Sequence, residues 1–361
     1  MKKVGLFFLI ILVLLLGIAG GGVSGYYVAR NYAVPAEERE NREEKQPVRV
    51  QKTMGAMGTA TDIAETCTDS VVNITVEREV KSYTGGSSIK QTTTGHGTGV
   101  IIRSDGYIVT CHHVIEDAKT ITVTFDDNTE MDGEIVGQDE RFDLAVIKVN
   151  GQDLKAAVIG DSNAIRAGDG VVVIGNPLGE FGSSVSVGVL SAPTREITIE
   201  GVPLRLMQTD AAVNPGNSGG GLFDMNGALV GIVNAKISAS GIEGIGFAIP
   251  WATIQEKVDS IIENGNTGKK AVLGVSTKPS ACYIDQEKVT CLEVVSVKSE
   301  GPAEKAGLEV GDMLISANGK SLEENSDLTL LVKYLSPGES LEFEIYRDEK
   351  IIAVNVVLGE E

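Results

Sequence analysis

Histidine is scarce in this sequence of 361 residues, which contains only His96, His112 and His113. His113 follows an alternating apolar run and precedes a short helical pattern in "YIVTCHHVIEDA". Because imidazole changes its charge near neutral pH, a histidine at such an edge is suited to act as a general base for a serine nucleophile. A base of this kind needs a serine on a bent backbone and a carboxylate that orients the imidazole ring.

The stretch "NPGNSGGGLFD", residues 214–224, supplies such a serine. A flexible loop would account for the composition alone. An oxyanion hole, however, also needs a tight bend free of large side chains, so that backbone N–H groups converge on one point. The pattern therefore predicts Ser218 as the nucleophile, with oxyanion-hole residues Gly216, Asn217 and Ser218.

Asp143 begins the apolar run "DLAVIKV", where a buried carboxylate requires a partner. The order His113, Asp143, Ser218 is that of chymotrypsin-type enzymes with two β-barrels. In this prediction His113 removes the serine proton and later returns it to the leaving amine. Asp143 fixes the imidazole tautomer and stabilises its cation.

The elements that must position these residues are mainly short strands. Runs such as "VVNITVEREV", "GTGVIIRSDGYIVT", "VVVIGNP" and "GIGFAIP" follow one another without long helices between them, which favours a barrel or a sandwich. Asp105-Gly106 marks a tight hairpin. A helix is expected from near Trp251 to Gly265. Residues 268–271 form a second linker, and the tail is expected to be a small α+β unit.

The N-terminus predicts a membrane segment. Lys2 and Lys3 precede an uncharged run over residues 4–29, which is long enough to span a bilayer. The alternative is a signal peptide cleaved after Ala19, since residues 17–19 are small-x-small. We expect an anchor at residues 1–29 with the bulk of the chain outside the cytoplasm, followed by a charged linker over residues 30–57.

The formal charge of −19 argues against a nucleic-acid partner. The four cysteines allow three pairings, and an extracytoplasmic location permits disulfides. We expect Cys282 and Cys291 to clip a local loop, with Cys67–Cys111 as a companion pair. Four reduced thiols are the alternative.

No metal or cofactor is expected. Adjacent residues such as Cys111-His112-His113 point to opposite faces of a strand, which disfavours a shared metal. "DDNTEMDGE" lacks the register of a calcium loop. "GHGTGV" precedes its strand, whereas a dinucleotide-binding glycine loop follows one.

Over residues 62–361 the chain resembles the HtrA/Deg serine proteases. The shared marks are Thr110 with His113-Val114, "DLAVIKV", "IGNPLG", "QTDAAVNPGNSGG", "GIGFAIP" and, in the tail, "LGV" and "GPAEKAGLEVGDMLISANGK". The resemblance implies a chymotrypsin-like double β-barrel protease domain at residues 58–267 and an α+β PDZ domain at residues 272–361. It also implies a homotrimer.

The chain departs from the family pattern at two places. The family usually has two asparagines before the histidine, where this chain has Cys111 and His112, and proline where Gly221 stands. Neither change touches the implied triad, and the spacing from Thr110 favours His113 as the active histidine.

The remaining predicted sites concern specificity and control. Ala212, Val213 and Ile245 should form an apolar specificity pocket. By resemblance, Leu273, Gly274 and Val275 capture the carboxylate of a bound peptide C-terminus. Leu328 and Leu331 line the same groove, or are ordinary core residues. Arg195 matches the arginine that relays activation to the oxyanion loop in the family; the alternative is a solvated loop charge.

These residues predict a membrane-tethered, extracytoplasmic serine endopeptidase, and the resemblance implies that it cleaves unfolded or damaged proteins. One alternative is a signalling protease that cuts one specific partner. The other is a chaperone or scaffold with a silent protease fold.

Overall fold

The computed structural model describes residues 58–84, 87–176, 183–199, 202–235, 244–284 and 286–361. All of them belong to one compact unit, residues 47–361. The predicted anchor (residues 1–29) and the whole predicted charged linker (residues 30–57) lie outside the described residues. Within the described ranges, no helix combines the length and the apolar character needed to cross a bilayer.

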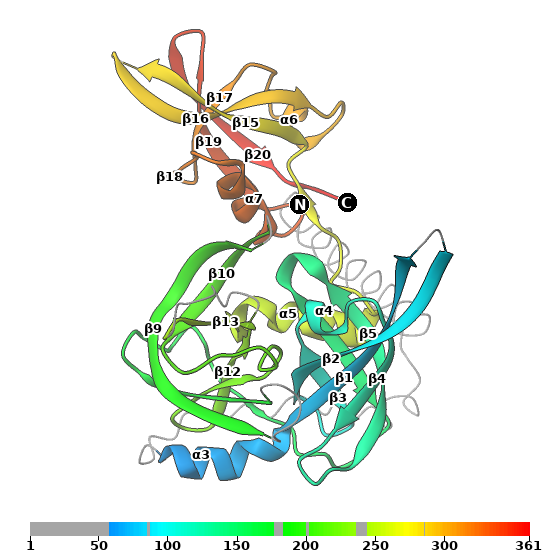
Figure 1. Ribbon diagram of the computed structural model, residues 1–361. Coiled ribbons are helices and arrows are strands. Elements are labelled where there is room, and N and C mark those ends of the chain that lie inside the picture. Colours follow the sequence, from blue (N-terminus) through cyan, green and yellow to red (C-terminus); the bar gives the residue numbers. More distant parts are fainter. Residues whose placement is uncertain (1–57, 85–86, 177–182, 200–201, 236–243, 285) are drawn as a thin grey trace, which may run out of the picture. The chain divides into compact units, whose positions relative to one another are not determined.

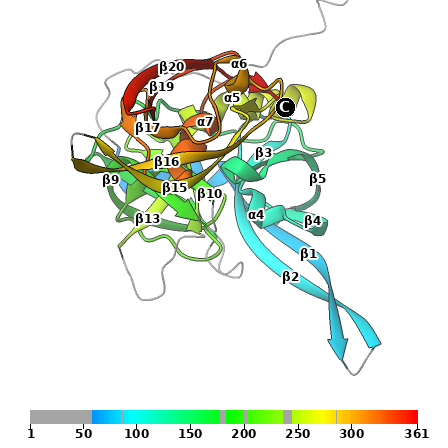
Figure 2. The same cartoon turned by 90° about the horizontal axis from the view of Figure 1, so that it is seen from above.

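The first part of the described chain, residues 71–149, contains a closed barrel in the order β1-β2-β3-β6-β5-β4. Its strands are β1 (Val71–Thr84), β2 (Ser87–Ile101), β3 (Tyr107–Thr110), β4 (Ala118–Thr124), β5 (Glu130–Asp139) and β6 (Leu144–Val149). The predicted hairpin at Asp105-Gly106 joins β2 to β3, and Gly106 has a φ of 100° there. β1 and β2 continue beyond the barrel as a long arm, which Figure 2 shows clearly.

The second part is a seven-stranded sheet in the order β11-β8-β9-β10-β13-β12-β7. Its strands are β7 (Val158–Ile159), β8 (Gly170–Gly175), β9 (Ser184–Ile199), β10 (Val202–Thr209), β11 (Gly221–Asp224), β12 (Ala228–Val233) and β13 (Gly246–Pro250). Because β11 also pairs with β12, six of these strands form a second ring. The mainly β prediction is confirmed.

Short helices connect and flank the barrels (Figure 1). They are α3 (Ala60–Cys67), η1 (Thr68–Ser70), α4 (His112–Ile115), η2 (Glu140–Phe142) and α5 (Trp251–Asn264). α3 begins with a capping box between Thr59 and Asp62. α5 ends at Gly265 in the left-handed conformation, with a φ of 76°, as the sequence predicted.

The C-terminal α+β part has its own hydrophobic core. Its elements are β14 (Ala271–Val272), β15 (Val275–Ile284), β16 (Glu287–Val297), α6 (Pro302–Lys305), β17 (Met313–Ala317), β18 (Lys320–Ser321), α7 (Asn325–Lys333), β19 (Ser340–Arg347), β20 (Lys350–Val357) and β21 (Gly359–Glu360). Leu292, Leu314 and Phe343 are fully buried in that core. Tyr334, just after α7, packs instead against the core of the barrels.

Candidate active site

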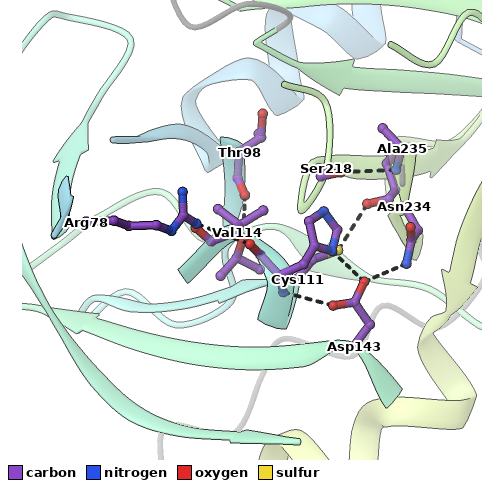
Figure 3. A network of polar contacts seen from close by, with 11 residues as sticks. Arg78, Thr98, Cys111, Val114, Asp143, Ser218, Asn234 and Ala235 are labelled. Carbon is purple, nitrogen blue, oxygen red and sulfur yellow. Dashed lines mark hydrogen bonds and ion pairs between the residues drawn. The ribbon is translucent and has the colours of Figure 1, made fainter. Parts of the chain in front are cut away.

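The carboxylate of Asp143, which Figure 3 labels, forms a close pair with the ring of His113. The ring atom Nδ1 of His113 lies 2.7 Å from Oδ2 of Asp143, and the backbone N–H of His113 donates to Oδ1 at 2.9 Å. Asp143 ends η2 with a φ of 50°, a left-handed conformation that aspartate tolerates. This turn faces the carboxylate towards α4, so both oxygens contact His113.

Asn234 is a third member of this cluster that sequence reasoning missed. Its amide Nδ2 donates to Oδ2 of Asp143 at 2.7 Å, and the residue is 1% exposed. Asn234 directly follows the apolar strand β12. A polar residue that ends a wholly apolar strand was the available signal, because such a side chain needs a buried partner.

His112 takes a different place. Its backbone N–H donates to the carbonyl of Asp143 at 3.1 Å, but its buried Nδ1 finds no hydrogen-bond partner in the described part of the chain. It lines a cavity of about 120 Å³ together with Glu116 and Glu140. The structure thus brings the ring of His113, rather than that of His112, to the Asp143 side chain.

Arg78, which reaches α4 from β1, was also missed. Its guanidinium donates to the carbonyls of Glu116, Val114 and His113 at 2.7, 2.8 and 3.3 Å. A cation at the C-terminal end of a helix satisfies carbonyls that have no partner within the helix. Arg78 therefore holds the short helix that carries His113.

Residues 214–220, named here the glycine turn, carry Ser218. Gly216 and Gly219 have φ values of 98° and 87°, which explains glycine at both positions. The N–H of Asn217 donates to the carbonyl of Asn214 at 3.0 Å and closes the bend. The backbone N–H of Asn217 is therefore engaged within the bend. Among the described residues, the N–H groups of Gly216 and Ser218 have no hydrogen-bond partner.

The hydroxyl of Ser218 accepts a hydrogen bond from the N–H of Ala235 at 3.1 Å. Within the described ranges, it makes no hydrogen bond to His113. Contacts of this kind are often long in a free enzyme and tighten when substrate binds.

The three residues of the predicted specificity pocket lie beside the glycine turn and β13. Ile245 stands immediately before β13, not within it as the strand prediction had it, and is 43% exposed. Val213 approaches Gly246 so closely that a Cβ there would lie 2.6 Å from its Cγ2. Ser186 donates to the carbonyl of Ala212 at 2.8 Å. The three side chains are apolar.

A cavity of about 830 Å³ lies between β14–β15 and α7. Leu273, Gly274 and Val275 line it, as does Leu328. Leu331 packs against the C-terminal core and is not among the lining residues. One of the two predicted groove leucines therefore lies at the cavity.

Arg195 lies on β9 and donates to Oε1 of Gln208 at 3.0 Å, within the second barrel. The neighbouring Glu196 forms an ion pair with Lys320 of the C-terminal part. In the structure, therefore, Glu196 rather than Arg195 reaches that part.

In this structure the four cysteines are reduced thiols, and none of them forms a disulfide. The thiol of Cys67 donates to Gly227 and that of Cys111 to Val233, at opposite ends of β12. These ends are roughly 20 Å apart, so the companion disulfide Cys67–Cys111 was wrong. Burial is the main cause, and the electrostatic effect of Cys282 the second cause, that raises the pKa of the Cys291 thiol to about 12.

One group in the described ranges has metal-ligand character: Cys111, His113 and Asp143 offer atoms within 4.8 Å of one another. Each of these atoms already has a protein partner, because His113 and Asp143 bond to each other and Cys111 donates to Val233. The geometry suits a carboxylate that orients the imidazole ring of His113 better than metal ligation.

Comparisons with known proteins identify two domains in the chain. Residues 97–232 match the trypsin-like peptidase domain, and residues 271–358 match the PDZ domain. The "Probable periplasmic serine endoprotease DegP-like" of Brucella suis is 39% identical over 272 residues, covering 73% of this chain and 52% of that protein. Its namesake from Chlamydia trachomatis is 40% identical over 275 residues, with 73% and 53% covered. The chain spans about half the length of these curated relatives.

One solved structure is matched over almost its whole length. The "HtrA-type protease AlgW with decapeptide" matches with a TM-score of 0.66 and 30% identity, covering 84% of this chain and 99% of that chain. Both domains are matched, and the match covers almost the whole of this solved HtrA-type protease. The chain therefore belongs to the HtrA family of trypsin-like serine proteases that carry a PDZ domain.

Proposed function

We propose that this protein is a serine endopeptidase whose triad is His113, Asp143 and Ser218. The observation that carries the proposal is the His113–Asp143 pair, 2.7 Å apart, in a chain whose glycine turn presents Ser218 from the other barrel. His113 acts as the base for Ser218, and Asp143 keeps the Nδ1 proton in place so that Nε2 can accept.

The oxyanion donors are the N–H groups of Gly216 and Ser218. Both are uncommitted in the described part of the chain. Preorganised donors of this kind stabilise the negative charge that develops on the substrate carbonyl oxygen. No metal or cofactor takes part in these steps.

The substrates are unfolded or damaged polypeptides, cut after aliphatic residues. Ala212, Val213 and Ile245 supply no charge that would compensate a buried lysine or arginine. The cavity beside α7 binds peptide C-termini, in line with the peptide named in the AlgW structure. Residues 1–29 anchor the protein in the membrane, and the bulk of the chain lies outside the cytoplasm, which is consistent with relatives named periplasmic. The protein assembles as a homotrimer.

Digestion of an unfolded polypeptide by the full chain, with the products sequenced by mass spectrometry, tests this function. We expect cuts after Val, Ala, Ile and Leu, and none from Ser218→Ala. Activity in Ser218→Ala near that of the wild type would reject the triad. Cuts mainly after Lys or Arg would reject the pocket.

The same digestion decides between the alternatives. A silent scaffold would cut nothing and would not react with a serine-directed fluorophosphonate. A signalling protease would leave diverse unfolded proteins intact and cleave one partner only.

A further inference from the structure

We propose that Thr98 is a positioning residue that holds the oxyanion hole in its working shape; this rests on the proposed function. Thr98 lies on β2, in the first barrel, and is fully buried. It is the threonine of "GHGTGV", the glycine-rich stretch that the sequence analysis distinguished from a dinucleotide-binding loop.

Thr98 is hydrogen-bonded to both residues that we propose as oxyanion donors. Its hydroxyl donates to the carbonyl of Gly216 at 2.7 Å, and its backbone N–H donates to the carbonyl of Ser218 at 2.9 Å. Within one residue, only φ and ψ separate the carbonyl from the N–H. Holding the two carbonyls therefore restricts the directions of the N–H groups of Gly216 and Ser218.

A second contact determines the direction of the hydrogen bond between the Thr98 hydroxyl and the Gly216 carbonyl. The N–H of Asn176 donates to Oγ1 of Thr98 at 3.0 Å, which occupies a lone pair of that oxygen. The hydroxyl proton is then free to point at the carbonyl of Gly216. A valine at this place would have the same shape, but it would leave both Asn176 N–H and Gly216 C=O without their partner.

The neighbouring glycines explain how Thr98 comes so close. A Cβ at Gly97 would lie 2.5 Å from Val114, and one at Gly99 would lie 2.6 Å from Ile108. Successive residues of a strand face opposite sides, so these two glycines pack into the first barrel while Thr98 faces the glycine turn. A Cβ at Gly219 would lie 2.0 Å from the carbonyl oxygen of Thr98. The turn and the strand are in direct contact.

A loosened turn affects catalysis more than substrate binding, because the oxyanion exists only in the transition state. Removing one oxyanion donor costs about 10²–10³-fold in kcat, and a residue that acts through such donors should cost less. We expect Thr98→Val to lower kcat for a peptide substrate at least tenfold, with KM within twofold of the wild type.

The matched control is Thr110→Val. Thr110 is equally buried, and its hydroxyl donates to the carbonyl of Thr98 at 2.7 Å; it packs against Gly219 but makes no hydrogen bond to the glycine turn. It should lose thermal stability but keep kcat within about twofold. Thr98→Ser keeps the hydroxyl and should restore most of kcat.

The experiment measures kcat, KM and the inhibition constant of a peptide boronate on the full chain. A boronate mimics the tetrahedral intermediate, so its affinity for Thr98→Val should fall in parallel with kcat. If Thr98→Val does not fold, Thr98→Ala is measured in the same way. Wild-type kcat and boronate affinity, a change in KM alone, an equal loss in Thr110→Val, or no rescue by Thr98→Ser would overturn the proposal.

Ser218→Ala is included to separate this proposal from the proposed function. If Ser218→Ala still cleaves, the proposed triad itself is wrong. If Ser218→Ala is inactive and Thr98→Val is normal, only the role of Thr98 is wrong.

Discussion

At the scale of single residues, the site depends on how completely Asp143 is satisfied. Its Oδ1 accepts the backbone N–H of His113, and its Oδ2 contacts both Nδ1 of His113 and the amide of Asn234. The residue is 8% exposed, so protein donors rather than water stabilise the carboxylate. Asn234 is therefore expected to keep the carboxylate oriented towards the imidazole ring.

We predict that Asn234→Ala lowers kcat about tenfold, because losing one donor to a buried charge costs about 1–3 kcal/mol and 1.4 kcal/mol corresponds to tenfold. KM for the same peptide should stay close to that of the wild type. Asn226→Ala, at an exposed turn, makes the same substitution and should leave both constants unchanged. Wild-type kcat in Asn234→Ala would show that Asp143 does not need this donor.

At the scale of elements, the β15–β16 hairpin carries the predicted disulfide. Cys282 pairs with Val289 and Cys291 pairs with Ser280, so the two cysteines are diagonal neighbours on adjacent strands. Both are buried, and Cys282 contributes to the raised pKa of the Cys291 thiol. An oxidising compartment would favour their bond.

We predict a Cys282–Cys291 disulfide in protein isolated from outside the cytoplasm, with Cys67 and Cys111 reduced. Cross-linking a short loop stabilises by about 2–4 kcal/mol, so reduction should lower the melting temperature. Non-reducing peptide mass analysis checks this directly. Four alkylatable thiols in such material would count against the bond.

Short local patterns were enough to predict the helix that ends at Gly265, the Asp105-Gly106 hairpin and the mainly β character. They also singled out His113, Asp143 and Ser218, because each stands beside a recognisable strand or turn. The contacts of Arg78, Thr98 and Asn234 could not be predicted in this way. Their partners lie 35 or more residues away in the chain, and pairing between distant segments leaves no local pattern.

At the scale of the molecule, the C-terminal part contacts the segment that precedes Asp143. The ring of Tyr334 meets Phe142 edge to face, with centroids 5.3 Å apart. Nζ of Lys333 lies 4.9 Å from the centre of the Phe142 ring and donates to the carbonyl of Pro203 at 2.7 Å. A change in this contact would therefore act on Phe142, the residue directly before Asp143.

Burial lowers the pKa of Lys333 to about 7, although the nearby carboxylate of Asp139 acts in the opposite direction. The pKa in the folded protein lies below the ordinary lysine pKa of 10.5, so the charged lysine destabilises this contact fully below pH 7. The destabilisation disappears as pH rises from the folded pKa towards the unfolded one. Stability should therefore rise across this window.

We predict that amide exchange in α7 and β10 is faster at pH 6 than at pH 9, once corrected for the intrinsic rate. Lys333→Met should remove most of this difference. Lys305→Met, at an exposed position of α6, carries the same substitution in the same domain and should retain the difference. An unchanged pH dependence in Lys333→Met would exclude Lys333 as its source.

The most direct test of the central claim is to locate the nucleophile by mass spectrometry after reaction with a fluorophosphonate. The account predicts one adduct per chain, on Ser218, in the wild type and in His112→Ala. In His113→Ala the adduct should be nearly absent, because the serine loses its base. An adduct on another residue, or equal labelling of His113→Ala, would contradict the assignment of His113 and Ser218.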